Sequence, residues 1–278
     1  MISLAGNRIL LCGKGGSGKT TIVSLLAHVL QYKNYNIIVV NGDASNPEGL
    51  PRLIFKRKNL EVPQTLINFF GGMKSVTCPI QDPSTLTRVN DTTPLTEKKV
   101  DILKELSTNY YIEENGMYLF LAGKIEDYGQ CDGPIEKVVR DFVVEGDWIT
   151  LVDMKGGLEQ FGRRTPDSMD IILCVLDPTF ESVFIANKVA SLCKEINMQN
   201  YWFILNKIDS SDLKSIIMHE MGDLKSKILG TVSYDPDLTR KQLKGDLSDS
   251  KDLYNDIEMI EKRLEVFSST VESGWDEL

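Results

Sequence analysis

Histidine and cysteine are scarce in this sequence. Two of the 278 residues are His and five are Cys. Because the cysteine count is odd and three of the five lie in apolar strand or helix patterns, we expect reduced thiols in a cytoplasmic protein rather than a disulfide framework. His28 and His219 lie within helical patterns, which favours structural roles over metal ligation.

Long apolar runs are also missing. No stretch approaches the roughly 18 apolar residues that a membrane helix needs. Residues 1–16 lack the basic region, long apolar core and small-residue cleavage site of a signal peptide, and they fit the first strand of a fold instead. We therefore expect a cytoplasmic protein with no membrane partner.

Positive charge is in deficit. The chain has 31 Lys+Arg against 40 Asp+Glu, a formal net charge of -9, and a pI of about 4.9. An acidic chain repels a phosphate backbone, so we expect no nucleic-acid partner. The other values, 42% hydrophobic and 26% charged residues, are typical of a globular protein.

Short apolar runs alternate with amphipathic segments, which predicts an α/β fold. We expect one domain over residues 1–267, with a mostly parallel central sheet of about seven to eight strands and helices on both faces. Residues 71–95 fit no period and predict an irregular surface excursion, and residues 268–278 predict a frayed tail. The expected strands are 8–12, 36–41, 117–121, 148–152, 170–176, 201–205 and 227–231. The expected helices are 19–31, 63–70, 96–106, 134–144, 180–196, 212–221 and 251–267.

The strongest motif is Gly-Lys-Gly-Gly-Ser-Gly-Lys-Thr-Thr at residues 13–21, between an apolar strand and a helical pattern. This is the context of a P-loop, whose backbone N–H groups and helix dipole hold a phosphate chain. We expect Lys19 to reach the β and γ phosphates, Thr20 to ligate Mg²⁺ and Thr21 to hydrogen-bond the α phosphate. The other nucleotide-binding residues of the loop are then Gly13, Gly15, Gly16, Ser17 and Gly18.

The expected strand 148–152 is followed by Asp153-Met154-Lys155-Gly156, a Walker B and switch II arrangement. We expect Asp153 to hold Mg²⁺ through water and Gly156 to offer its backbone N–H to the γ phosphate. A glycine-rich turn without a ligand is the alternative. Arg163 and Arg164 follow, and pairing with acidic neighbours is favoured over a bridge to a partner subunit.

Asp43 follows the expected strand 36–41 by two residues. A carboxylate at the carboxyl end of a strand beside the P-loop lies where ligands bind in open α/β sheets. The alternative for residues 43–46 is a helix-capping turn.

A candidate base site begins where the expected strand 201–205 ends, at Asn206-Lys207-Ile208-Asp209. The Asn206 side chain can face a purine edge with one donor and one acceptor, and Lys207 follows it. In guanine-specific GTPases an N-K-x-D run reads guanine through its Asp, so GTP is the alternative to ATP.

The run Lys14-Gly15-Gly16-Ser17-Gly18-Lys19-Thr20-Thr21 resembles the deviant Walker A loop of the MinD, ParA and nitrogenase iron protein superfamily. In that family the first lysine crosses the interface of a dimer that sandwiches two ATP molecules. The resemblance therefore implies a homodimer that closes on ATP and a Lys14 that acts in trans. It also implies that Asn206 reads adenine and that a loop covers the base with Tyr234, Asp235 and Pro236.

At the first switch, members of the superfamily commonly show Asp-x-Asp, where one carboxylate contacts hydrated Mg²⁺ and the other orients the attacking water. This chain has Asn41 at the first position, so the resemblance leaves Asp43 to activate water. We hypothesise that ATP hydrolysis is slow while nucleotide binding is intact. A nucleotide switch without useful turnover is the alternative.

Several local runs are similar to the CooC-type accessory ATPases that help insert nickel into carbon monoxide dehydrogenase, and the similarity spans about residues 7–247. It implies a client metalloenzyme such as carbon monoxide dehydrogenase. The runs are Asp43-Ala44-Ser45-Asn46, Phe69-Phe70-Gly71-Gly72, residues 152–163, Leu176-Asp177-Pro178 and Ser233-Tyr234-Asp235-Pro236.

CooC-type proteins carry a Cys-x-Cys pair that gives four thiolates to one interfacial metal ion. Here Cys131 holds the first position and Gly133 the second. A symmetric dimer then offers two thiolates, joined by the Asp132 carboxylates, to a weak Ni²⁺ or Zn²⁺ site. An ordinary thiol in an interface turn is favoured over metal binding at Cys131.

Two other functions stay open within the superfamily. A donor of electrons like the nitrogenase iron protein needs a second cysteine just after switch II, and residues 153–164 contain none. A positioning ATPase of the MinD or ParA kind needs a basic membrane helix or a basic DNA-binding face, which the acidic balance disfavours.

Overall fold

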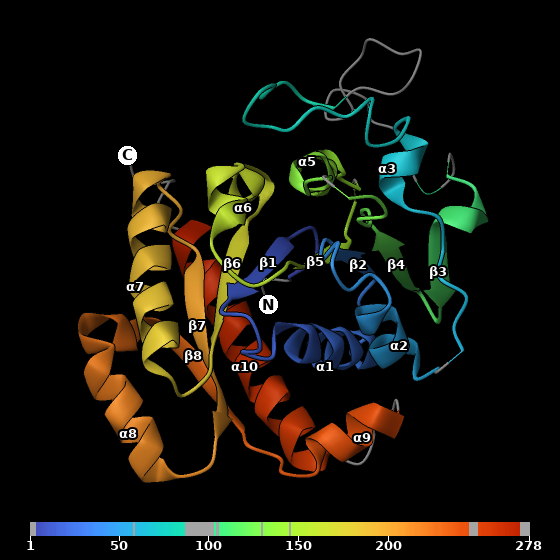
Figure 1. Ribbon diagram of the computed structural model, residues 1–278. Helices are drawn as coiled ribbons and strands as arrows, with labels where there is room; N and C mark the ends of the chain where they lie inside the picture. The colour runs from blue at the N-terminus through green and yellow to red at the C-terminus, as the bar shows by residue number, and fades with distance from the viewer. Residues whose placement is uncertain are drawn as a thin grey trace.

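The computed structural model describes residues 4–57, 59–86, 103, 106–128, 130–144, 146–244 and 250–272, and one eight-stranded sheet forms its centre (Figure 1). The strand order is β3-β4-β2-β5-β1-β6-β7-β8, and only β3 and β4 pair antiparallel. The predicted α/β class and mostly parallel sheet are confirmed. The strands are β1 (Arg8–Gly13), β2 (Ile37–Asn41), β3 (Tyr111–Glu114), β4 (Met117–Leu121), β5 (Ile149–Asp153), β6 (Ile171–Leu176), β7 (Tyr201–Ile208) and β8 (Ile228–Ser233).

Edge strand β3 is the one strand of the described sheet that the apolar runs did not predict. Its sequence is Tyr-Ile-Glu-Glu, and none of its residues is fully buried. A two-residue turn, Asn115-Gly116, joins it to β4, with φ of 53° and 78°. Both values are left-handed, which is the geometry of a tight hairpin and a reason for Asn-Gly at this point.

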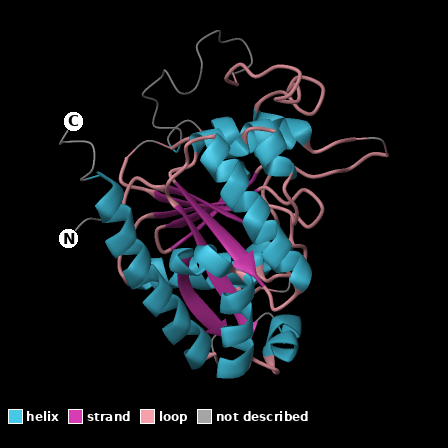
Figure 2. Ribbon diagram, turned by 90° about the vertical axis from the view of Figure 1, so that its left-hand side faces the viewer, coloured by secondary structure: helices cyan, strands magenta, loops and turns pink. Residues whose placement is uncertain are grey.

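The helices cover both faces of the sheet (Figures 1 and 2). Successive residues of β1 face opposite ways: Ile9 and Leu11 pack with α1, α2 and α10, while Leu10 and Cys12 pack with α3, α5, α7 and α8. The helices are α1 (Lys19–Tyr32), α2 (Gly49–Phe55), α3 (Leu66–Phe69), α5 (Gly133–Asp141), α6 (Glu159–Gly162), α7 (Phe180–Glu195), α8 (Ser211–Glu220), α9 (Leu238–Lys244) and α10 (Lys251–Glu272). Short 3-10 helices lie at Thr108–Tyr110, Thr165–Ser168 and Gly222–Lys227.

Several helix boundaries differ from the expectation. The helix expected at 63–70 is only the four-residue α3, and α10 continues past Phe267 into the segment where we expected a frayed tail. Short helices α2, α6 and α9 were not predicted. Most of the helix expected at 96–106 lies outside the described residues. None of the helices in the described segments is long and apolar enough to cross a membrane.

Residues 71–86 form neither helix nor strand, as expected for the described part of the excursion, and they lie over α5 (Figure 1). Two cations of α5 hold them there. Lys137 Nζ donates to Asp82 Oδ2 at 2.9 Å, and Arg140 Nη2 donates to Ser84 O at 3.0 Å. Both cationic side chains are almost fully buried, so their hydrogen bonds hold this irregular segment in one position against α5.

Candidate functional site

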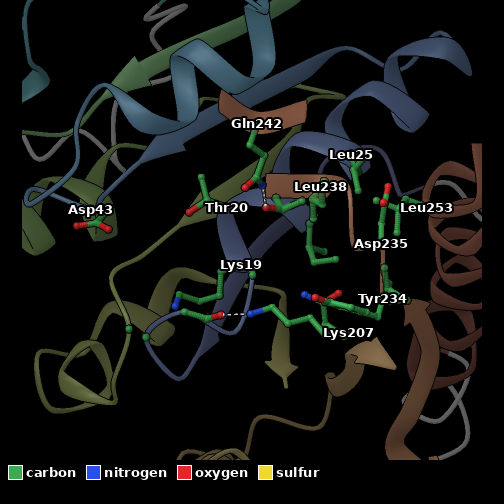
Figure 3. A pocket seen from close by; sticks show the side chains of 18 of the residues that line it. Lys19, Thr20, Leu25, Asp43, Lys207, Tyr234, Asp235, Leu238, Gln242 and Leu253 are labelled. Carbon is green, nitrogen blue, oxygen red and sulfur yellow. Dashed lines mark hydrogen bonds between the residues drawn. The ribbon is translucent and has the colours of Figure 1, made fainter. Parts of the chain in front are cut away.

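A cavity of about 770 Å³ lies at the carboxyl edge of the sheet (Figure 3). In a parallel sheet the strand ends meet at one edge, and ligands bind there. The loops that follow β1, β2, β5 and β8 and the last residues of β7 and β8 contribute to this cavity. Of the residues assigned to the site from the sequence, its lining includes Gly15, Gly16, Gly18, Lys19, Thr20, Thr21, Asp43, Gly156, Asn206, Lys207, Tyr234 and Asp235.

The P-loop wraps the start of α1. Gly13 and Gly18 have φ of 133° and 102°, which residues with a side chain rarely adopt, so the path of the loop depends on glycine. Lys19 is only 6% exposed, and its Nζ donates to Lys14 O at 3.0 Å and to Gly13 O at 3.3 Å. The ammonium group is thus held over the loop, where an incoming phosphate would replace the carbonyl oxygens as its partner.

Thr20 and Asp153, the two residues expected at Mg²⁺, are brought together. The Asp153 side chain is buried, and its Oδ1 has no hydrogen-bond partner. Burial raises the pKa of Asp153 to about 7, although a hydrogen bond from Thr20 and the charge of Lys19 act in the opposite direction. A buried oxygen without a partner fits the site of a hydrated cation, since a Mg²⁺-bound water would supply the missing donor.

Asn41 lies beside Asp153 in the register of β2 and β5. Its Oδ1 accepts from Asp43 N at 3.0 Å, and its Nδ2 donates to Pro47 O at 3.1 Å. The Asn41 amide therefore fixes the loop that carries Asp43. In turn, Asp43 Oδ1 accepts from Ser45 N at 3.0 Å, so the carboxylate takes part in a local turn while it lines the cavity.

Switch II lies directly on the P-loop. Gly157 N donates to Gly13 O at 3.1 Å. A Cβ added at Gly156 would collide with the backbone of Gly15 and lie 3.1 Å from Lys14 C. Only glycine permits this approach, so the position of switch II is tied to the conformation of the phosphate-binding loop.

Lys14 contacts its own chain. Its Nζ donates to Thr179 Oγ1 at 2.9 Å and lies 3.1 Å from Asp177 Oδ2. Burial alone would raise the pKa of Asp177, but hydrogen bonds from Ser182, Thr179 and Lys14 hold it below its ordinary value. The sequence did not predict this contact, because its two halves lie at the ends of different strands, β1 and β6.

The Asn206-Lys207 pair is joined to the P-loop. Asn206 Nδ2 donates to Ser17 O at 2.7 Å. Lys207 Nζ donates to Gly16 O at 2.6 Å (Figure 3). Asp209 is exposed and is not among the described residues that line the cavity. The carboxylate that reads guanine in an N-K-x-D run is therefore not part of the cavity lining.

The other end of the cavity is apolar. Leu25 of α1, Leu238 of α9 and Leu253 of α10 line it, and Leu25 and Leu253 are buried. Gln242 Nε2 of α9 donates to Thr21 Oγ1 at 2.8 Å. The sequence analysis missed these four residues, and no motif or spacing in the sequence marked them.

The expected base-covering residues are only partly in place. Pro236 lines a neighbouring cavity of about 400 Å³, not the one beside the P-loop. Tyr234 and Asp235 line both. Asp235 Oδ2 accepts from Lys241 Nζ at 2.7 Å and from Ser250 Oγ at 3.0 Å, and the hydrogen bond from Lys241 holds the pKa of Asp235 low. Its carboxylate thus joins this loop to α9 and to the start of α10.

The turn that holds Cys131 is linked to switch II by charge. Asp132 forms ion pairs with Lys155 and with Arg163, and Arg163 Nη1 also lies 2.5 Å from Glu136 Oε1. Burial alone would raise the pKa of Asp132, but the two cations hold it low. Arg163 and Arg164 both pair with acidic neighbours, as expected. Cys131 itself is exposed.

Fold and site together define a P-loop nucleotide-binding protein. A family model of the CobQ/CobB/MinD/ParA nucleotide-binding domain matches residues 9–248. The chain belongs to this family, which confirms the superfamily inferred from the deviant Walker A loop.

Relatives and solved structures agree with this assignment. The chain is 28% identical to an uncharacterised ATP-binding protein of Methanocaldococcus jannaschii over 88% of this chain and 97% of the relative. It is 24% identical to the carbon monoxide dehydrogenase accessory protein CooC of Rhodospirillum rubrum over 82% of this chain and 84% of that protein. The MinC:MinD cell division protein complex of Aquifex aeolicus aligns with a TM-score of 0.64 at 19% identity, over 93% of this chain and 95% of that one, which shows a shared fold.

Proposed function

We propose that this chain is an ATP-binding and ATP-hydrolysing homodimeric switch that assists metallocentre maturation, in the manner of nickel insertion into carbon monoxide dehydrogenase. The observation that carries the proposal is the ion-pair link from switch II to the Cys131 turn: Lys155 and Arg163 both hold Asp132. Hydrolysis at one end of this link would change the surface at the other.

ATP is favoured over GTP because the carboxylate that reads guanine in an N-K-x-D run does not line the cavity. Leu25, Leu238 and Leu253 offer apolar contact to a purine ring, and Asp209 is not among the described residues that line the cavity. Lys19 and Lys207 supply positive charge beside the phosphate loop. Mg²⁺, when bound, neutralises phosphate charge, and Thr20 and Asp153 are the residues that would hold it. Asp43, which lines the cavity, is the group to orient the attacking water.

The coupling runs through short contacts. Gly156 packs against the P-loop, so a γ phosphate there would move it. Lys155 directly precedes Gly156, and its ammonium group donates to the Asp132 carboxylate. Asp132 lies between Cys131 and Gly133, so a displacement of switch II would be passed to this turn through the ion pairs of Asp132 with Lys155 and Arg163.

The client enzyme is proposed by analogy with CooC, a relative whose role is given by its name. CooC of Rhodospirillum rubrum is a carbon monoxide dehydrogenase accessory protein. A cytoplasmic nickel-dependent metalloenzyme of that kind is therefore the proposed partner, and Cys131 is the proposed contact for Ni²⁺ or Zn²⁺.

The switch is tested by light scattering of purified protein in Mg-ATP and in Mg-ADP, with phosphate release measured in parallel. The wild type is expected to dimerise in ATP and to release phosphate slowly. Lys14→Ala should stay monomeric in both nucleotides, and Asp43→Asn should dimerise but release little phosphate. Equal mass in ATP and ADP, with Lys14→Ala like the wild type, would overturn the proposal.

The link to the cysteine turn needs its own measurement. The alkylation rate of Cys131 is expected to differ between ATP and ADP in the wild type. Asp132→Asn should remove that difference while ATP binding persists. Asp167→Asn is the matched control, since Asp167 pairs with Arg164 and not with the turn.

A further inference from the structure

Cys78 lies where the second thiol of a Cys-x-Cys pair would begin. Its Sγ is 2.6 Å from the position that a Cβ at Gly133 would occupy, and its Cβ is 3.1 Å from the same point. The two residues are far apart in the sequence, one in the irregular segment 71–86 and one at the start of α5. A cysteine at 133 is missing from this chain, yet a sulfur atom fills the space that its side chain would use.

Cys131 is two residues before Gly133 and is exposed. Consecutive Cα atoms are 3.8 Å apart, so the Cα atoms of Cys131 and Gly133 lie within about 7.5 Å of each other. Cys78 is partly exposed, whereas Cys12, Cys174 and Cys193 are buried in the core. Of the five thiols, the two that solvent reaches are thus the two at this turn.

Hydrogen bonds with α5 fix the position of the segment that carries Cys78. Besides the Lys137–Asp82 and Arg140–Ser84 bonds, Leu86 N donates to Asp141 Oδ2 at 2.7 Å. Cys78 O accepts from Gln81 N at 2.9 Å and from Asp82 N at 3.0 Å, which closes a turn just after the thiol. Buried charges along one helix therefore hold the segment that carries Cys78.

We infer that Cys78 and Cys131 form a thiolate pair that binds a soft transition-metal cation of the Zn²⁺ or Ni²⁺ class, with Cys78 in place of the second cysteine. Thiolate is the ligand such cations prefer, and each thiol releases its proton on binding. The pair lies beside Asp132, which switch II holds through Lys155 and Arg163. Metal affinity is therefore sensitive to the nucleotide.

One chain supplies two ligands. No cluster of three or more His, Cys, Asp or Glu side chains able to hold a metal occurs in the described part of the chain. Two copies would give four thiolates, the closed tetrahedral set of a tight zinc site, instead of the two expected from Cys131 alone. The four-thiolate site rests on the proposed function, because it needs a homodimer. The thiol pair within one chain does not depend on it.

The test is metal binding by reduced full-length protein. Co²⁺ reports thiolate ligation through its charge-transfer absorbance, and Zn²⁺ affinity is measured by competition with a chelating dye. Cys78→Ala and Cys131→Ala are each expected to remove the absorbance and to weaken Zn²⁺ binding at least 100-fold. Cys193→Ala, which removes a buried thiol, should bind as the wild type does.

A thiol exchange separates ligation from a loss of packing. Cys78→Gly combined with Gly133→Cys moves the sulfur from one segment to the other at the same place, and no positive φ at Gly133 opposes a side chain. We expect this double variant to regain Co²⁺ absorbance that Cys78→Gly alone lacks. In the wild type, Zn²⁺ should also protect Cys78 and Cys131 together from alkylation, as seen by peptide mass spectrometry.

The outcomes distinguish this inference from the proposed function. Zn²⁺ binding that needs Cys131 but is unchanged in Cys78→Ala would overturn the thiol pair, and so would no thiolate absorbance in the wild type. ATP-dependent dimerisation would be unaffected by either result. Conversely, metal binding that needs both cysteines in a chain that never dimerises would refute the switch and support the pair.

Discussion

The Lys14 ammonium lies 3.1 Å from Asp177 Oδ2, so the lysine that distinguishes this P-loop is bound within its own subunit. The contact is largely shielded, since the side chains are 25% and 11% exposed. A dimer in which each Lys14 reaches the partner's nucleotide must break two such pairs. At roughly 1 kcal/mol for each pair, they oppose dimer formation by about 2 kcal/mol.

Asp177→Asn is therefore expected to favour the ATP-bound dimer. The asparagine keeps the shape of the side chain and loses the charge that retains Lys14. Two pairs at about 1 kcal/mol each correspond to a dimer Kd lower by about 30-fold. Analytical ultracentrifugation in Mg-ATP measures the change. A Kd equal to or weaker than that of the wild type would show that this ion pair does not hold Lys14 back.

Much of the fold could be predicted because its signals are local. Parallel strands buried on both faces are continuous apolar runs, and these gave all strands of the described sheet except β3. β3 was missed because Tyr-Ile-Glu-Glu at an edge is half polar, although Asn115-Gly116 was a usable hairpin signal.

The residues of the candidate site also fall into two groups, those in local motifs and those brought together only by packing. Lys19, Thr20 and Asp153 belong to motifs with a fixed spacing, so their neighbourhood was evident from the sequence. Gln242 meets Thr21 across 221 residues, and Cys78 meets Gly133 only because α5 anchors an irregular segment. No period or spacing encodes such contacts, since they depend on how the finished domain packs.

Asp153 makes stability depend on pH. Its pKa is about 7 in the folded chain against an ordinary 3.8. Between these values the folded state holds a proton that the unfolded state releases, so the free energy of unfolding falls as pH rises from about 4 to 7. Asp153→Asn should flatten this slope in nucleotide-free protein, measured by thermal unfolding from pH 4.5 to 8. A slope identical to that of the wild type would contradict the assignment.

The same proton should appear in ligand binding. Mg²⁺ needs the carboxylate, so Mg-ADP affinity is expected to rise as pH increases through about 7, with release of up to one proton per site. Calorimetry in buffers of different ionisation enthalpy counts that proton. The exposed-carboxyl variant Asp223→Asn should keep the pH dependence, and Asp153→Asn should lose it.

Switch II offers a matched pair of glycines. A Cβ at Gly156 would strike the backbone of Gly15, whereas a Cβ at Gly162 meets nothing within 4 Å. Gly156→Ala should push switch II off the P-loop and lower ATP hydrolysis at least tenfold, while Gly162→Ala stays within twofold. Phosphate-release assays compare the two. Similar activity in both variants would mean that close approach of Gly156 to the P-loop is not required.

Asn41→Asp restores the carboxylate that the superfamily commonly carries, and here sequence and structure predict different outcomes. If the missing charge limits hydrolysis, the variant should be faster. The structure gives the amide another task, because Nδ2 donates to Pro47 O and the side chain is 2% exposed beside Asp153. A carboxylate cannot donate there, so we expect a loss of roughly 1–3 kcal/mol in unfolding free energy and no gain in rate.

Thermal unfolding and phosphate release, measured together, decide between the two roles of Asn41. A loss of 1–3 kcal/mol corresponds to a Tm lower by about 2–4 °C for each kcal/mol in a chain of this size. Asn187→Asp adds the same charge on the exposed surface of α7 and should change neither quantity. A faster Asn41→Asp variant with an unchanged Tm would show that the carboxamide limits chemistry and does not hold the loop of Asp43.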